Sequence, residues 1–238
     1  MTFSELVAIL WRPISAAEWS ALLLSLQVSL ISILLIALPG VLIAWLLARV
    51  SFRGKSFLNG LVHLPLVMPP VVVGYFLILL LGPRAWVGSF LEEQFGLVLA
   101  FHFQGAALAS GIMGFPLLVR SARISFEHTV IPLEEAARTL GASPWRVFYT
   151  ITLPHAWPGI LSGIILAAGR SFGEFGATIS FAGNIAGETR TLPLAIFSSL
   201  QSPGNEDSAL RLALISILLA YVTLLAGEYF IHRSGQRS

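Results

Sequence analysis

Residues 169–173 (GRSFG) match the G-x-S-x-G pattern that surrounds the nucleophilic serine of many hydrolases. Such a serine needs a sharp strand-to-helix turn, which presents its hydroxyl to a histidine and an acid. Here the motif lies inside a long apolar segment that predicts a helix, so the serine lacks that setting. The pattern therefore does not indicate a hydrolase.

The sequence likewise does not indicate a nucleotide-binding site or a metal site. Gly54-Lys55-Ser56 resembles the end of a phosphate-binding loop, but Arg49 stands where the loop needs its first glycine. The histidines are scattered without the H-E-x-x-H spacing of a zinc site, and the chain has no cysteine to serve as a thiol nucleophile. We expect no catalytic residue, no metal and no cofactor in this chain. Any energy that it uses must come from a partner.

Two charged residues, Arg170 and Glu174, stand in an apolar segment, and Thr178 follows one turn later. In one continuous helix the three would share a face. A lone charge in hydrocarbon costs roughly 2.5–3.5 kcal/mol even on the mildest scale, so the two charges should be paired. They either line or gate a path, or form a structural pair between helices. A tight anion site is disfavoured, because a residue that lines a path must also release the ion.

The composition places these residues in a membrane protein. Hydrophobic residues make up 56% of the chain and charged residues 11%, whereas soluble domains carry about 25% charged residues. The net charge of +2 and the absence of a basic block do not indicate a nucleic-acid partner. We predict an all-α polytopic membrane protein in the lipid bilayer, with residues 1–238 as a single domain.

Five apolar segments are long enough to cross a bilayer, which takes about 20 residues. Residues 1–10 are too short to span and suit the membrane interface, and a sixth span or re-entrant segment is left open. Pro65, Pro69 and Pro70 interrupt the second segment, which favours a broken helix beside a pore over a simple kink. The predicted spans are residues 19–47, 57–81, 96–119, 157–181 and 210–231.

Small residues recur at every fourth position of the fourth segment. Such residues let helices approach closely in lipid. The segment then has a special position, at the centre of a bundle or at a subunit interface. Alternatively, it packs in the ordinary way against another helix of its own chain. Both interpretations stay open. The residues are Gly159, Gly163, Ala167 and Ser171.

Lysine and arginine are more frequent in the first and third loops and in the C-terminal tail than in the other connections. Because cytoplasmic loops carry the excess of these residues, we expect both loops and the C-terminus in the cytoplasm and the N-terminus outside.

The third loop, residues 120–154, predicts two short helices at the membrane surface. Pro132 and the acids Glu134 and Glu135 suit the start of the first helix. Gly141 suits the position just after its end, and Ser143-Pro144 suits the start of the second. We expect Leu153 and Pro154 to end the second helix before the fourth span.

One face of the first short helix carries Leu133, Ala136, Ala137 and Leu140. An apolar face of this kind lies either in the groove of a partner protein or on lipid. The paired glutamates and small alanines suit lipid poorly, so the partner groove is favoured.

The same loop carries a spaced motif. Glu135-Ala136-Ala137 is followed after three residues by Gly141, and nine residues later by Ile151-Thr152-Leu153-Pro154. This spacing resembles the EAA loop of ABC importer permeases at every fixed position. Four further segments are similar to molybdate importer permeases in particular: residues 63–75, 136–148, 170–181 and 187–193.

The resemblance implies a type I ABC importer permease fold and transport of molybdate across the bacterial inner membrane by alternating access. It implies a permease homodimer, two ATP-binding cassette subunits that bind ATP and Mg²⁺, and a periplasmic or extracellular molybdate-binding protein. The expected ATPase-coupling residues are Leu133, Glu134, Glu135, Ala136, Ala137, Leu140, Gly141, Leu153 and Pro154. The expected pore or gate residues are Arg170, Glu174, Thr178, Pro69 and Pro70.

Three alternatives remain at this point. A sulfate or tungstate permease would look similar, because these are related tetrahedral dianions and selection is expected in the binding protein. A secondary anion carrier would work without an ATPase, but no internal repeat is visible. A membrane-embedded enzyme would need a cluster of reactive side chains within the spans, which the sequence does not show.

Overall fold

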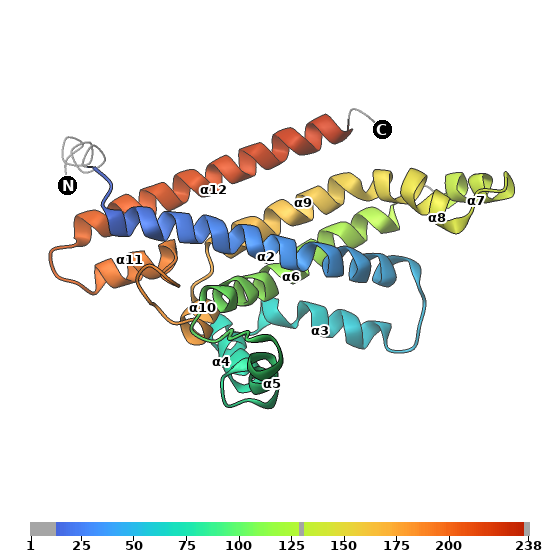
Figure 1. The fold of residues 1–238 in the computed structure, drawn as a ribbon. Coiled ribbons are helices and arrows are strands. Elements are labelled where there is room, and N and C mark those ends of the chain that lie inside the picture. The colour runs from blue at the N-terminus through green and yellow to red at the C-terminus, as the bar shows by residue number, and fades with distance from the viewer. Residues whose placement is uncertain (1–12, 129–130, 236–238) are drawn as a thin grey trace.

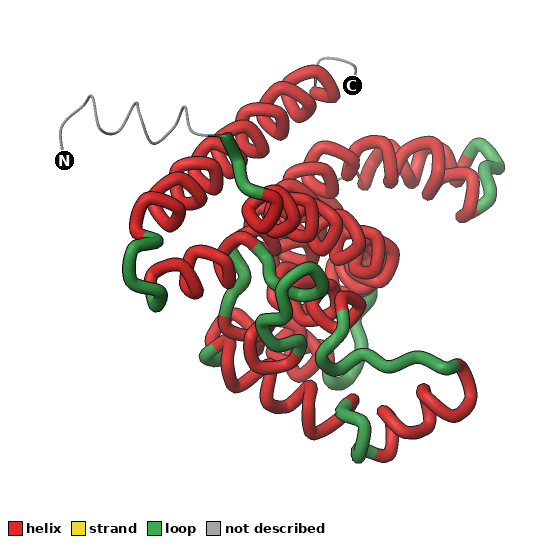
Figure 2. Tube along the Cα trace, turned by 60° about the vertical axis from the view of Figure 1, so that its left-hand side comes forward, coloured by secondary structure: helices red, strands yellow, loops and turns green. Residues whose placement is uncertain are grey.

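The computed structural model describes residues 13–128 and 131–235, with side chains described as far as Tyr229. Within this part of the chain every regular element is a helix and none is a strand, as Figure 2 shows. The predicted interfacial segment, residues 1–10, lies outside the described residues. The expectation of an all-helical chain is confirmed.

Long apolar helices form the body of the molecule (Figure 1). Helix α6 (Phe103–Glu127) packs against both α2 (Ala16–Arg49) and α9 (Leu153–Phe172), and α12 (Glu206–Gly235) packs on α9. The described residues hold four helices long and apolar enough to cross a membrane, or five if a bent pair is counted as one span. The number of spans predicted from the sequence agrees with this range.

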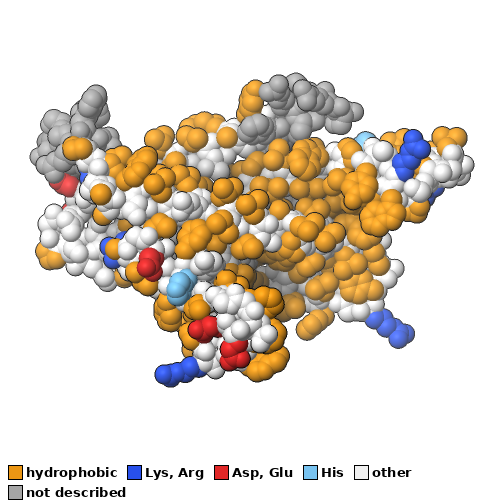
Figure 3. Space-filling view, in the orientation of Figure 1, with side chains coloured by type: hydrophobic (Ala, Val, Ile, Leu, Met, Phe, Trp, Pro, Cys, Tyr) orange, Lys and Arg blue, Asp and Glu red, His pale blue; other side chains and the backbone are white. Residues whose placement is uncertain are grey.

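Helix surfaces that face away from the bundle are apolar, as lipid contact requires. On α2, for example, Leu30, Leu34 and Leu38 are exposed at four-residue spacing. Hydrophobic side chains cover the middle of the face in Figure 3, whereas charged side chains lie toward its ends and lower edge. This distribution fits a chain that crosses a hydrocarbon layer.

The second predicted span is broken more strongly than a kink. The chain bends by 116° between helices α3 (Lys55–Val67) and α4 (Pro70–Leu81). Pro70 occupies the first turn of α4, where its missing N–H costs nothing, whereas Pro65 lies inside α3 without ending it. The predicted break is confirmed at Pro69 and Pro70, and the predicted interruption at Pro65 is wrong.

Two other predicted spans have shifted boundaries. Gly96 ends the unpredicted helix α5 (Trp86–Phe95) with a positive φ of 63°, so the predicted span 96–119 in fact begins at Phe103 and continues to Glu127. The predicted span 157–181 ends at Phe172, and α10 (Gly176–Phe181) is a separate helix. The short helix α11 (Leu192–Leu200) was also not predicted.

The small residues of α9 face α6 of the same chain. A Cβ added to Gly163 would stand 3.0 Å from the Leu118 carbonyl oxygen, and Ala167 lies against Gly114. Ser121 Oγ donates a hydrogen bond of 2.9 Å to the Gly159 carbonyl. For Gly159, Gly163 and Ala167, ordinary packing within one chain is therefore the correct interpretation of the stripe.

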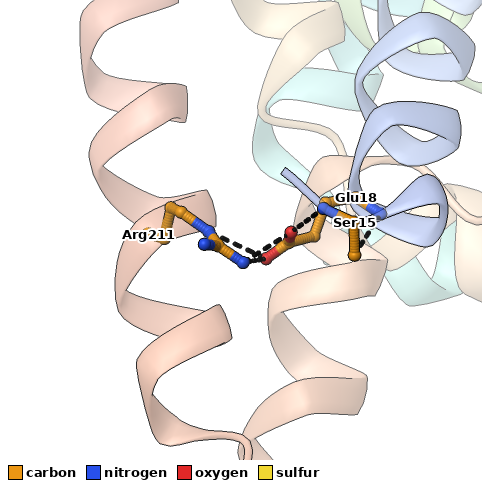
Figure 4. Close-up of polar contacts among 3 residues, drawn as sticks. All are labelled: Ser15, Glu18 and Arg211. Atoms are coloured by element: carbon orange, nitrogen blue, oxygen red, sulfur yellow. Dashed lines mark hydrogen bonds and ion pairs between the residues drawn. The ribbon is translucent and has the colours of Figure 1, made fainter. Parts of the chain in front are cut away.

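A buried ion pair joins the first and last long helices (Figure 4). Arg211 Nη2 lies 2.6 Å from both carboxylate oxygens of Glu18. Glu18 also completes a capping box with Ser15 at the start of α2: the Ser15 N–H donates to Glu18 Oε2 at 2.8 Å, and the Glu18 N–H donates to Ser15 Oγ at 3.3 Å. Burial of both charges is tolerated because each satisfies the other.

The contact between α6 and α9 predicts opposite effects for one substitution at two glycines. In Gly159→Ala, the new Cβ would stand 2.4 Å from the Ser125 Cβ, so we expect overpacking to lower the free energy of unfolding by about 1–3 kcal/mol. In Gly169→Ala nothing lies within 4 Å, and the higher helix propensity of alanine should raise it by up to about 1 kcal/mol. Thermal unfolding of the purified protein in detergent measures both, and equal shifts would contradict the packing described here.

Candidate functional site

The loop between α6 and α9 begins with the short helix α7 (Ile131–Thr139). Gly141 follows it with φ of +88°, a conformation that glycine adopts without strain. Ser143 Oγ accepts a hydrogen bond from the Arg146 N–H at 3.4 Å and caps α8 (Pro144–Val147). The predicted two helices, the glycine turn and the serine cap are all confirmed.

The end of the second helix was predicted wrongly. Leu153 and Pro154 do not end the helix, because α8 continues through the π-helical turn η1 (Phe148–Thr152) directly into α9. Pro154 occupies the first turn of α9, directly after the wider π turn, in which the Leu153 N–H donates to the Phe148 carbonyl. One continuous helical segment, residues 144–172, therefore joins the loop to the membrane.

The apolar face of α7 is uncovered. Leu140 is 89% exposed and Leu133 is also exposed, and Ala136 shares this surface. Farther along the loop the exposed rings of Trp145 and Tyr149 stack at 6.2 Å between centroids. Exposed apolar side chains on one surface indicate a binding site for another molecule. Sequence reasoning singled out neither ring, although their four-residue spacing on a helix was a readable signal.

Glu134 and Glu135 have opposite environments. Glu135 is exposed, whereas Glu134 is only 7% exposed. Glu134 Oε1 receives two hydrogen bonds, from Arg49 Nη2 at 2.8 Å and from Thr152 Oγ1 at 2.6 Å. The helix dipole accounts for two acidic residues in the first turn of α7, but it does not predict the side chains that bind Glu134. Arg49 lies 85 residues away, and no local pattern could have found it.

The predicted pore residues lie where two helices are interrupted. Arg170 and Glu174 form an ion pair of 2.5 Å, and Glu174 is only 1% exposed. Helix α9 ends before Glu174, which instead accepts a hydrogen bond of 2.7 Å from the Ala177 N–H at the start of α10. A single helical face shared with Thr178 is therefore wrong, because Thr178 belongs to α10.

The break between α9 and α10 meets the break between α3 and α4. A Cβ added to Gly176 would stand 2.7 Å from Pro70, and one added to Gly74 would stand 2.7 Å from the Ala177 carbonyl oxygen. The structure thus brings Pro70 and the segment from Glu174 to Thr178 into one region. A pore or gate role for these residues stays a prediction.

An all-helical bundle with an exposed loop between two long helices is a fold that chains of solved ABC transporters share. The fold agrees with a chain of a bacterial ABC transporter involved in the import of alginate, with a TM-score of 0.74 and 19% identity over 98% of this chain and 84% of that one. It also agrees with the inward-facing MetNI methionine ABC transporter, with a TM-score of 0.62 and 17% identity over 98% and 99%.

Residues 40–235 match the family of binding-protein-dependent transport system inner membrane components, and the chain belongs to that family. It is 51% identical to the molybdenum transport system permease protein ModB of Escherichia coli K12, over 93% of this chain and 96% of that protein. ModB of Haemophilus influenzae is also 51% identical, over 91% and 94%. The sulfate transport system permease protein CysW of Synechocystis is 36% identical, over 91% and 78%. The chain is thus an inner-membrane transport component.

An experiment can distinguish the two roles that stay open for the Arg170–Glu174 pair, a gate of the transport path and a purely structural ion pair. Arg170→Met leaves a buried carboxylate without its cation, so we expect the free energy of unfolding to fall by about 3 kcal/mol. The double variant Arg170→Met/Glu174→Gln should recover most of that loss, because glutamine still accepts from the Ala177 N–H. Thermal unfolding reports stability, and uptake by the double variant then separates the roles: normal uptake contradicts a gate, and lost uptake contradicts a purely structural pair.

Proposed function

We propose that this chain is the permease subunit of an ABC importer that carries molybdate across the bacterial inner membrane. The observation that carries this proposal is the 51% identity, over nearly the whole length of both chains, with ModB proteins from two bacteria. The EAA spacing from Glu135 to Pro154 gives independent support for coupling to an ATPase.

The arrangement of the helices supports the proposed orientation. Helices α7 and α8, the α2–α3 connection and the later end of α12 lie toward one end of the molecule (Figure 1). The start of α2 and the α11–α12 connection lie toward the other end. Because the first group includes the arginine-rich and lysine-rich connections, we assign it to the cytoplasm and the other end to the outside.

Two copies of the chain would enclose the path, and an ATP-binding cassette subunit would dock on the loop of each copy. The exposed side chains Leu133, Glu135, Ala136 and Leu140, with the half-buried Ala137 among them, supply the surface for that contact. ATP and Mg²⁺ belong to the partner, which supplies the energy. An external molybdate-binding protein would deliver the anion at the opposite end.

Alternating access requires helices that change their relative positions around the path. The meeting of two interrupted helices around Pro69, Pro70 and the Glu174–Thr178 segment provides such a region, because a break lets each half move separately. Arg170 is partly exposed there, and because its charge is already paired with Glu174 it would attract an anion only weakly. Weak attraction suits passage better than a tight site, from which the ion would leave slowly.

A sulfate importer is the second candidate, since CysW is 36% identical over 91% of this chain. Reconstitution distinguishes the two. The chain, its ATPase and the binding protein are assembled in proteoliposomes, and ATP-dependent uptake of molybdate, tungstate and sulfate is measured. We expect molybdate uptake that disappears without ATP or without the binding protein. Sulfate uptake in place of molybdate, or uptake driven by a gradient alone, would overturn the assignment.

Replacement of Gly141 should separate ATP hydrolysis from uptake. In Gly141→Val the positive φ costs about 1–2 kcal/mol and distorts the turn after α7, while an added Cβ meets nothing within 4 Å. We expect assembly and ATPase activity to survive and molybdate uptake to fall about tenfold. Gly204→Val is the matched control, because Gly204 has φ of +85° and equally open space in the α11–α12 connection. Unchanged uptake in the Gly141 variant would refute the role of this turn.

A further inference from the structure

Glu134 stands at a junction of three elements. It belongs to α7, and its Oε1 atom accepts hydrogen bonds from Arg49, the last residue of α2, and from Thr152, the last residue of η1. The carboxylate is nearly buried, and the Arg49 side chain is 17% exposed. Apart from this junction, α7 packs chiefly against its neighbours α8 and η1. Glu134 therefore provides the direct link from α7 to the far end of α2.

The strength of this link follows from its chemistry. Hydrogen bonds to an ionised group contribute roughly twice as much as neutral ones. Removing one partner from a buried charge is more costly still, because the other stays desolvated and unpaired. Arg49 Nε is also buried and has no acceptor among the described residues, so the bond from Nη2 to Glu134 is the contact that holds this side of the guanidinium. The three side chains should move as one unit when α7 is displaced.

The third partner stands at a deformable point. Thr152 closes the π-helical turn, immediately before α9 begins. A π turn is less stable than α-helix and is frequent where a helix serves a function. A pull on the Thr152 hydroxyl therefore acts at the boundary between the loop and the long helix that leads to Arg170.

We propose that Glu134 is a positioning residue that transmits the displacement of α7 to α2 and α9. The inference rests on the proposed function, since a motor subunit must first displace α7. Glu135 and the apolar face of α7 then contact the ATPase. Glu134 does not contact the ATPase, and it transmits the displacement of α7 to α2 and α9. This role differs from the expectation drawn from the sequence, which placed Glu134 among the docking residues.

The test compares Glu134→Gln and Thr152→Val with wild type in the assembled transporter. Both substitutions preserve shape: the first removes the charge that holds Arg49, and the second removes the hydroxyl bond. We expect co-purification with the ATPase and basal ATP hydrolysis to stay normal. Molybdate transported per ATP hydrolysed should fall about tenfold for Glu134→Gln, as expected for loss of a charge-assisted bond. Thr152→Ser keeps the hydroxyl and should restore the ratio.

Glu127→Gln is the matched control, because Glu127 forms an exposed ion pair of 2.8 Å with Arg123 at the same end of the molecule. It should transport normally. If Glu134→Gln fails to assemble, Thr152→Val and Thr152→Ser decide the question. Wild-type transport per ATP in both Glu134→Gln and Thr152→Val would overturn the inference. A parallel loss of assembly, hydrolysis and uptake in Thr152→Val would also overturn it, since that would indicate a merely structural role.

A second measurement does not depend on the transported ion. The chain has no cysteine, so spin labels can be attached to Arg53→Cys and Arg138→Cys, two exposed positions beside the junction. We expect a narrow distance distribution in the assembled wild type and a broader one in Glu134→Gln. An unchanged distribution would overturn the inference. Absence of ATP-dependent molybdate uptake in the wild type would instead refute the proposed function and leave the distance measurement valid.

Discussion

The structure depends on the pairing of charges that are buried among apolar helices. The charged side chains that are buried in the described residues are Glu18, Glu134, Glu174 and Arg211, and each takes part in an ion pair. An unpaired charge in such surroundings would cost several kcal/mol, so these pairs decide which segments can lie together. One pair joins α2 to α12, one joins α2 to the loop, and one holds the end of α9 beside α10. Hydrophobic burial alone would not specify these neighbours, because lipid is as apolar as the helices.

Backbone polar groups impose a similar constraint where helices are interrupted. Non-helical backbone at membrane depth is tolerated only where protein or water satisfies it. The Glu174 carboxylate accepts from the Ala177 N–H while it pairs with Arg170, so one side chain serves both the chain break and the charge balance. The nearby glycines Gly74 and Gly176 let α4 approach α10 closely enough to cover the break. The Ala177 N–H at this break is thus satisfied within the protein.

Local features of this chain were predictable from the sequence, and distant contacts were not. Composition and apolar runs gave the helical class and the number of spans, and Gly141, Ser143 and Pro144 gave the geometry of the loop. Each of these depends on composition or on residues that are close together in the sequence. The partners of Glu18 and Glu134 lie 193 and 85 residues away, so only the packed bundle defines them. The end of α9 was missed because Gly173 and Glu174 are followed by a further run of mostly apolar residues, 175–182, which continues the hydrophobic pattern past the break.

Helix geometry explains how a nine-residue segment can be held firmly and still present a free surface. Successive residues of an α-helix point about 100° apart, so Glu134 faces the bundle while Glu135 faces outward. The same rotation places Leu133 and Leu140 on the exposed side. A helix without the buried carboxylate could tilt on its apolar face when a partner binds, and the tilt would absorb the movement. A helix anchored at α2 and η1 must carry those elements with it. In the role proposed for it, the buried glutamate turns a binding surface into a mechanical connection, which is the property that the proposed ATP-driven importer would require of this loop.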